Sequence, residues 1–306
     1  MNAKAIGLLL YISCFIGCSS WTTEIEKPTN PKIPVQFGLQ FKKEILPFPE
    51  SKAIPSIDIG EPGVTNPPSV ELVDLCKSIE YVVYDKATNK FVKHHQKNQG
   101  DDDFGIVYDT LPAGKYQVSF LAHSSLNAQQ KENIISFNEI SDMFYATKDI
   151  EVNSMDVQSD ISLTRAVSLI HLVASDTIPN KLQTLSLSAT GYPKMFDMLT
   201  GYGHLSGTEG AYVKTFSAED LKKAADSISF LTLIPENNGL LELTQTAKDK
   251  DNNVLRTRTI SKVSPEKGKE LRYTGKLYSP ANPDDTYKLE IKDVAWSLAK
   301  DSVLKD

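Results

Sequence analysis

Apolar and polar residues alternate along much of the chain, with the period of two that is typical of β-strands with one buried face. The alternation is clearest at residues 35–41, 116–122 and 287–291. Near-continuous apolar runs at residues 165–174 and 228–234 predict strands that are covered on both faces. Residues 124–145 are expected to form an irregular connection, or one short helix at about residues 134–143. Ser217 begins a capping box that predicts a second short helix to about Ala225.

Many short strands and few short helices predict an all-β fold rather than an α/β enzyme. The chain has 306 residues, enough for about two domains. We therefore expect two tandem β-sandwich domains, at residues 35–164 and 165–306. Residues 18–34 are polar and contain three prolines, which predicts an extended tether. A hairpin is expected at residues 241–263, and a turn is expected at residues 111–114, where Gly114 is free to take positive φ.

The N-terminus has the features of a secretory signal peptide at residues 1–17. Lys4 is followed by an apolar stretch to Gly17, which is shorter than the roughly 20 residues that span a bilayer. Gly17 followed by Cys18 resembles a bacterial lipobox, whereas ordinary secretion requires no cysteine there. The sequence thus predicts lipid attachment at Cys18 and a membrane anchor at the cell outer membrane.

The cysteines give no intramolecular disulfide. The chain has three, at Cys14, Cys18 and Cys76. Cys14 leaves with the signal peptide and Cys18 is acylated, so Cys76 has no partner. Cys76 lies in an apolar stretch and is expected to be a small buried hydrophobe rather than a nucleophile.

No motif predicts a catalytic residue, a cofactor site or a metal site. His94 and His95 precede three aspartates, but adjacent strand residues point to opposite faces, so we expect a solvated loop there. Residues 249–253 resemble the start of a calcium loop, but Val254 stands where that loop requires glycine, so a hairpin tip is expected. His171 shares a strand face with apolar residues and is expected to be a hydrogen-bonded core histidine. The net charge of −6 and the absence of a basic cluster argue against nucleic acid as a partner.

The overall organisation resembles the fimbrillin superfamily of Bacteroidetes, whose subunits build type V pili. The resemblance rests on the lipobox at Cys18, the turn and strand at residues 111–116, and the run at residues 161–170. It implies two transthyretin-like β-sandwich domains, export as an outer-membrane lipoprotein, other fimbrial subunits as partners, and no enzymatic activity.

The sequence departs from the pattern of this family at the site of proteolytic maturation. Polymerising members of that family are cut by an Arg-specific protease in the first domain, and a neighbour's strand fills the groove that the lost strand leaves. Here no arginine precedes Arg165, and a cut at Arg165 would remove a whole domain. This favours an uncut, lipid-retaining subunit that anchors or caps a fibre. A relative that never polymerises, or a protease of other specificity, is also consistent. The family places the exchanged strands at residues 35–41 and 294–304.

Two other classes of function fit the same organisation. An envelope lipoprotein that captures surface glycans beside an outer-membrane transporter would carry an exposed aromatic platform, and Trp21, Trp296 or some of the twelve tyrosines could stack on sugars. A hydrolase with a scattered site would need a cleft with two carboxylates roughly 5–9 Å apart.

Overall fold

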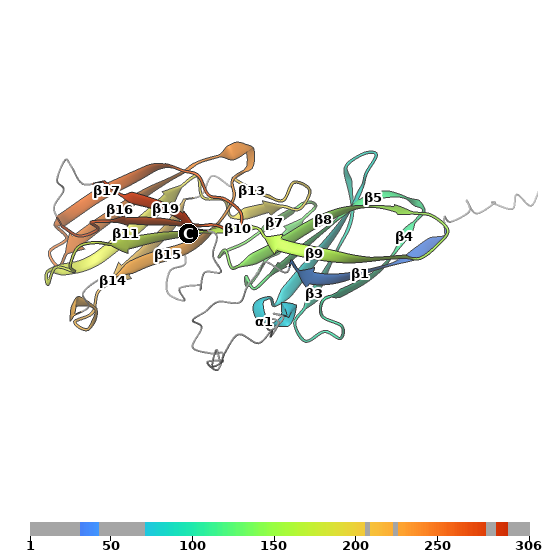
Figure 1. Cartoon of the computed structure of the whole chain (residues 1–306), viewed down its shortest axis with the longest axis horizontal. Helices are drawn as coiled ribbons and strands as arrows, with labels where there is room; N and C mark the ends of the chain where they lie inside the picture. Colours follow the sequence, from blue (N-terminus) through green and yellow to red (C-terminus); the bar gives the residue numbers. More distant parts are fainter. Residues whose placement is uncertain (1–30, 43–70, 206–208, 223–225, 280–285, 293–306) are drawn as a thin grey trace, which may run out of the picture. The chain divides into compact units, whose positions relative to one another are not determined.

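The computed structural model describes residues 31–42, 71–205, 209–222, 226–279 and 286–292 (Figure 1). The predicted signal peptide, Cys18, most of the tether and the predicted exchange segment at residues 294–304 lie outside these residues. The chain separates into Met1–Pro31 and a compact unit, Lys32–Asp306, which contains every strand discussed below. The prediction of an all-β protein is confirmed.

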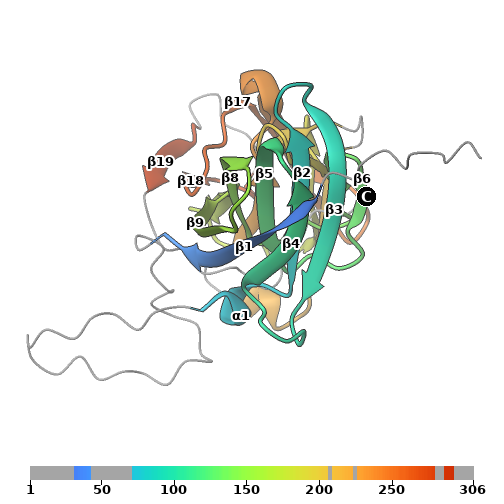
Figure 2. The same cartoon turned by 90° about the vertical axis from the view of Figure 1, so that its right-hand side faces the viewer.

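Within the described residues, the strands form one seven-stranded sheet and three four-stranded sheets. The larger sheet has the order β3-β2-β5-β8-β9-β1-β4. Its strands are β1 (Lys32–Phe41), β2 (Ser78–Asp85), β3 (Lys90–Asn98), β4 (Ile106–Pro112), β5 (Gly114–His123), β8 (Met143–Val152) and β9 (Val157–Arg165), and helix α1 (Leu72–Leu75) precedes β2. β8 and β9 pair at Phe144–Arg165 and Tyr145–Thr164, and the sheet folds over there into two facing layers (Figure 2). We call these strands the N-terminal sandwich.

The remaining long strands form two sheets, with orders β15-β10-β18-β19 and β14-β11-β16-β17. They are β10 (Val167–Ala174), β11 (Leu182–Thr190), β14 (Gly210–Thr215), β15 (Ser227–Leu233), β16 (Leu241–Asp249), β17 (Val254–Val263), β18 (Glu270–Gly275) and β19 (Lys288–Lys292). Leu172 and Phe230 of the first sheet share a buried cluster with Leu187 and Leu243 of the second. We call these strands the C-terminal sandwich. The predicted hairpin is confirmed as β16 and β17, and the two apolar runs are confirmed as β10 and β15.

A small fourth sheet pairs strands that precede β8 with strands that follow β11. Its order is β13-β12-β7-β6, built from β6 (Gln129–Lys131), β7 (Ile134–Ser136), β12 (Met195–Asp197) and β13 (Tyr202–His204). Ile135 of β7 pairs with Phe196 of β12, and both are fully buried with Val82 and Tyr84 of β2. Of the two alternatives for residues 124–145, the short helix is wrong: β6 and β7 pair with each other, and β7 also pairs with the distant β12. The remaining residues before β8 form an irregular connection, as the other alternative predicted. The division at residue 165 stays a prediction.

Two local expectations have different outcomes. Gly114 does not adopt positive φ; it begins β5, while Leu111 and Pro112 end β4. The Tyr116 hydroxyl donates a hydrogen bond to the Pro112 carbonyl (3.0 Å) across this connection, which leads from one layer to the facing one. The capping box at Ser217 forms, since its hydroxyl accepts the Asp220 amide and its own amide donates to the Asp220 carboxylate. It starts the short 3₁₀ helix η1 (Asp220–Lys222), and the rest of the predicted helix, at residues 223–225, lies outside the described residues.

Asp176 fastens the segment after β18 to the C-terminal sandwich. Its carboxylate accepts the backbone N–H groups of Leu277 (2.9 Å), Tyr278 (3.0 Å) and Ser279 (2.7 Å). Partial burial raises the pKa of the Asp176 carboxyl, but these hydrogen bonds lower it by more, so the pKa lies below its ordinary value of 3.8.

We expect Asp176→Asn to lower the free energy of unfolding by about 1–3 kcal/mol at pH 7. A carboxyl whose folded-state pKa is lowered stabilises the fold fully above its unfolded pKa and loses that effect as the pH falls through the folded pKa. Thermal melts at pH 7 and pH 2.5 should therefore show a difference between wild type and variant that shrinks in acid. An equal difference at both pH values would contradict this role, and Asp160→Asn, at an exposed position, is the matched control.

Candidate functional site

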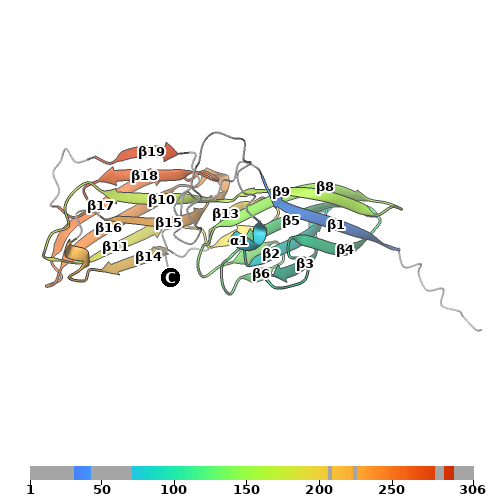
Figure 3. The ribbon, with the colours of Figure 1, turned by 60° about the horizontal axis from the view of Figure 1, so that its bottom comes forward.

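The predicted N-terminal strand is confirmed as β1, which begins at Lys32 and lies between two other strands (Figures 2 and 3). Its first part pairs antiparallel with β4, with Lys32 opposite Pro112 and Gly38 opposite Ile106. Its later part pairs in parallel with β9, beginning with Val35 beside Val157. Both edges of β1 are thus hydrogen-bonded, although β1 stands far from β9 in the sequence.

β1 also fills part of the sandwich core. Alternate side chains point inward and are at most 9% exposed: Ile33, Val35, Phe37 and Leu39. The Phe37 ring packs against Phe120 (centroids 5.1 Å apart) and Tyr81 (5.8 Å). If β1 left, it would open an apolar groove with unpaired backbone on both sides, which is a surface that binds another strand.

Lysines from β3 cover the free edge of β4. Lys93 Nζ donates to the Thr110 carbonyl (2.9 Å) and to Asp109 Oδ1 (2.5 Å). Lys97 Nζ donates to the carbonyls of Ile106 (2.8 Å) and Asp103 (2.9 Å). These ammonium groups occupy acceptors that an added strand would need, so the β4 edge is protected against strand addition.

Replacing Lys93 with methionine is expected to cost about 2 kcal/mol of folding free energy, because Asp109 is nearly buried and loses its cation. The freed carbonyl should also promote self-association. Urea denaturation and light scattering measure the two effects. Lys90→Met, at an exposed position of the same strand, should change neither, and an unaltered Lys93→Met protein would show that this edge needs no cover.

Arg165, the first arginine of the chain, is buried. Its guanidinium makes hydrogen bonds of 2.8, 3.1 and 2.8 Å to the Asp142 carboxylate and lies over the Phe144 ring, 5.1 Å from the centroid. The side chains of both ion-pair partners are at most 7% exposed. A protease cannot reach Arg165 while this region is folded.

In the C-terminal sandwich, β19 is an exposed edge among the described strands. Leu289 and Ile291 lie opposite the buried Tyr273 and Leu271 of β18, yet they are 47% and 52% exposed (Figure 3). They belong to the apolar side of the sheet but lack cover from the described residues. An exposed apolar edge of this kind favours pairing with a further strand.

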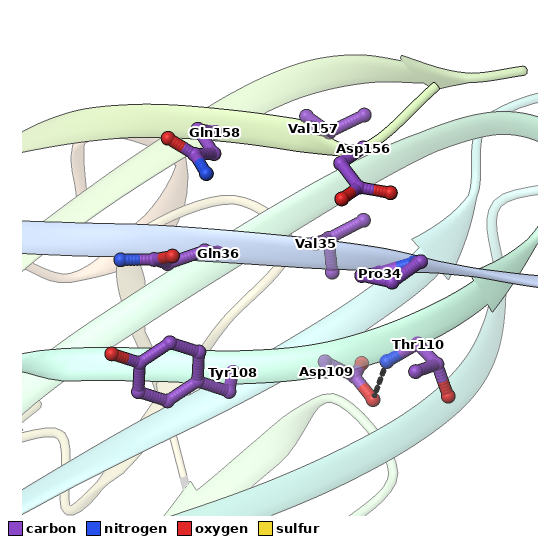
Figure 4. Close-up of a pocket in the computed structure, with 9 residues that line it drawn as sticks. All are labelled: Pro34, Val35, Gln36, Tyr108, Asp109, Thr110, Asp156, Val157 and Gln158. Atoms are coloured by element: carbon purple, nitrogen blue, oxygen red, sulfur yellow. Dashed lines mark hydrogen bonds between the residues drawn. The ribbon is translucent and has the colours of Figure 1, made fainter. Parts of the chain in front are cut away.

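A shallow depression of about 430 Å³ crosses β4, β1 and β9 (Figure 4). Its lining consists of Pro34, Val35, Gln36, Tyr108, Asp109, Thr110, Asp156, Val157 and Gln158. The Tyr108 side chain is 56% exposed. The sequence analysis did not single out Tyr108, because no local pattern separates an exposed tyrosine from the many that lie in a core.

The histidine pair is not in a loop, which corrects the sequence prediction. His94 and His95 lie on β3 and face opposite ways: His94 Nε2 is 2.5 Å from Glu80 Oε2, and His95 stacks on Tyr81. The buried His123 approaches the same carboxylate, at 3.3 Å. Burial raises the pKa of Glu80, but the hydrogen bonds from His123 and His94 outweigh it and leave the pKa below its ordinary value. His94 and His123 thus both face the Glu80 carboxylate, whereas Nδ1 of the buried His123 makes no hydrogen bond with the described residues.

The other predicted residues also have structural surroundings. Cys76 is free and buried, and burial raises the pKa of its thiol, so it is unreactive. His171 Nδ1 lies 2.9 Å from Glu270 Oε1, in agreement with a hydrogen-bonded histidine. Asp249 Oδ1 accepts the amides of Asp251 and Asn253 in the hairpin turn. In the part of the chain that the structure describes, no cluster of three metal-ligating side chains occurs. Its helices are also too short or too polar to cross a membrane.

The fold is that of bacterial fimbrial and adhesin-like proteins. The fimbrial anchor protein Mfa2 from Porphyromonas gingivalis aligns over 90% of this chain and 99% of its own length, with 10% identity and a TM-score of 0.50. A candidate adhesin from Bacteroides ovatus aligns over 83% of this chain and 88% of its own, with 11% identity and a TM-score of 0.50. The predicted resemblance to fimbrillins is thereby confirmed at the level of the fold.

The sequence itself assigns the family. The chain belongs to DUF6562, a family of unknown function, whose model matches residues 96–288. No curated protein matches the sequence.

Proposed function

We propose that this protein is a structural or anchor subunit of a fimbria at the cell surface, rather than an enzyme. The observation that carries the proposal is β1, a first strand that fills the core of a sandwich from a position between β4 and β9. The similarity of fold to a fimbrial anchor protein supports it. Strand addition is the mode of assembly that such a slot and the exposed β19 edge would serve.

Within that role, the features favour a subunit that keeps its first strand. Arg165 is buried, and the segment before it contains no arginine, so Arg-specific removal of β1 has no substrate in the folded protein. With β1 in place the N-terminal slot is closed, and Lys93 and Lys97 cover the β4 edge. Contact with a neighbouring subunit would then use the β19 edge together with residues 294–304. A lipid on Cys18 would hold the subunit in the outer membrane.

An immunoblot of the native envelope fraction, run unboiled and boiled, tests the proposal. Strand-exchanged fibres are kinetically stable, so a high-mass ladder should appear unboiled and collapse on boiling. The mass of the boiled band shows whether β1 has been removed. Deleting residues 294–306 should abolish the ladder. A single monomer band under both conditions would count against a fimbrial role.

A disulfide lock tests whether β1 stays in place. Gln36 of β1 and Gln158 of β9 are register partners, and neighbouring strands lie about 4.8 Å apart, which suits a disulfide. The double variant Gln36→Cys, Gln158→Cys should still form the ladder if this chain is an anchor. Loss of the ladder, restored by a reductant, would mean that β1 leaves its slot and that the chain is a polymerising subunit. Gln158→Cys alone is the control.

A further inference from the structure

The depression over β4, β1 and β9 carries a second inference, because its chemistry differs from that of a strand-binding surface. Gln36 is the register partner of both Tyr108 and Gln158, so these three side chains form one row across three strands. Pro34 lies opposite Thr110 in the next row, and Asp156 lies at its other side (Figure 4). With strands about 4.8 Å apart, each row is about 10 Å long.

The groups in these rows suit a ligand with both an apolar face and many hydroxyls. The exposed Tyr108 ring and the Pro34 ring offer flat apolar surface. Gln36 and Gln158 provide amide donors and acceptors, and Asp156 provides carboxylate acceptors. With the other described residues, the side chains of these three make no hydrogen bond. A pyranose ring presents C–H groups on its face and hydroxyls around its edge, which matches this arrangement.

The charges in the depression select among ligands. None of the nine lining residues is cationic. Asp156 contributes an exposed carboxylate, whereas the Asp109 side chain is nearly buried and is paired with Lys93. Lys97 Nζ lies 5.8 Å from the centroid of the Tyr108 ring and donates to two backbone carbonyls. The Asp156 carboxylate therefore disfavours a phosphate, a sulfate or a uronic acid at its end of the depression. An extended peptide could not add as a strand either, because both edges of β1 are already paired.

We infer that this depression binds a neutral polysaccharide, with one sugar ring stacked on Tyr108 and its hydroxyls bonded by Gln36, Gln158 and Asp156. The depression is shallow and open, so it accommodates an internal segment of a long chain rather than an enclosed monosaccharide. This binding is independent of fibre assembly, since it uses the outward face of the sandwich with β1 in place.

Affinity electrophoresis of the purified full-length protein tests the inference. Native gels would contain starch, laminarin, galactomannan or xyloglucan as neutral probes, and polygalacturonate or heparin as acidic probes. At least one neutral probe should retard the wild type. Tyr108→Ala should weaken that retardation at least tenfold, and Gln158→Ala severalfold. Phe91→Ala removes another exposed aromatic ring, 37% exposed on β3, and should leave it unchanged.

Circular dichroism melts of the variants establish that they remain folded, as expected for outward-facing positions. The inference is overturned if no neutral probe retards the protein, if only acidic probes do so, or if folded Tyr108→Ala binds like the wild type. Because the purified protein is used, these results do not depend on whether a fimbria forms.

Discussion

Phe37→Ala is expected to lower the free energy of unfolding by about 3–5 kcal/mol. The Phe37 side chain is fully buried and packs against Tyr81 and Phe120, so its removal leaves a cavity at the centre of the sandwich. Urea denaturation of the purified protein measures the change. Hydrogen exchange should also accelerate at the β1 amides before it accelerates in β2 or β5, because β1 loses its main contact with the facing layer.

Gln36→Ala is the matched control for this prediction. Gln36 is the preceding residue on the same strand and points outward, so its replacement should change stability by less than about 0.5 kcal/mol. A loss below about 1 kcal/mol for Phe37→Ala would mean that β1 does not fill the core. It would also remove the main support for a strand-exchange slot.

Asp142→Ala should be comparably damaging, at about 3–5 kcal/mol, because it leaves the Arg165 guanidinium buried without its carboxylate. Asp149→Ala removes an exposed ion pair with Lys86 (2.9 Å) and should cost at most about 1 kcal/mol. Chemical denaturation of both variants beside the wild type gives the comparison. Similar small losses for the two would show that the Asp142–Arg165 pair contributes little.

Asp142→Ala should also change the susceptibility of Arg165 to proteolysis. An Arg-specific protease should leave native wild type uncut at Arg165, whereas Asp142→Ala should be cut there within a short digestion, because local opening exposes the bond. Mass spectrometry of the fragments identifies the site. Rapid cutting of the wild type at Arg165 would contradict the argument that this arginine is protected.

Strands with a strong local pattern could be predicted from the sequence. The alternation at residues 35–41 gave the inward face of β1, and continuous apolar runs gave β10 and β15. In each case burial of the side chains follows directly from the period of the pattern. The hairpin of β16 and β17 could also be predicted, because its two strands are adjacent in the chain.

Features that depend on distant partners could not be predicted. The segment at residues 134–136 pairs with the adjacent β6 on one side and with the distant β12 on the other. No local signal encodes the pairing of Ile135 with Phe196. His94 was expected in a loop, but the buried Glu80 faces it from β2. Lys93 and Lys97 are four residues apart, so both side chains lie on the same face of β3. That they can cover a sheet edge follows only from the strand order, which places β3 at the end of the sheet.

The parallel pairing of β1 with β9 has a consequence for the order of folding. β1 is synthesised first, but Val157 and its neighbours, which complete its hydrogen bonding, are made only after most of the sandwich. Pairing between segments so distant in sequence is slow. During that interval the apolar face of β1 is uncovered and accessible to chaperones and proteases. We therefore expect β1 to be most accessible between its own synthesis and the arrival of β9, and to become protected once the sandwich closes.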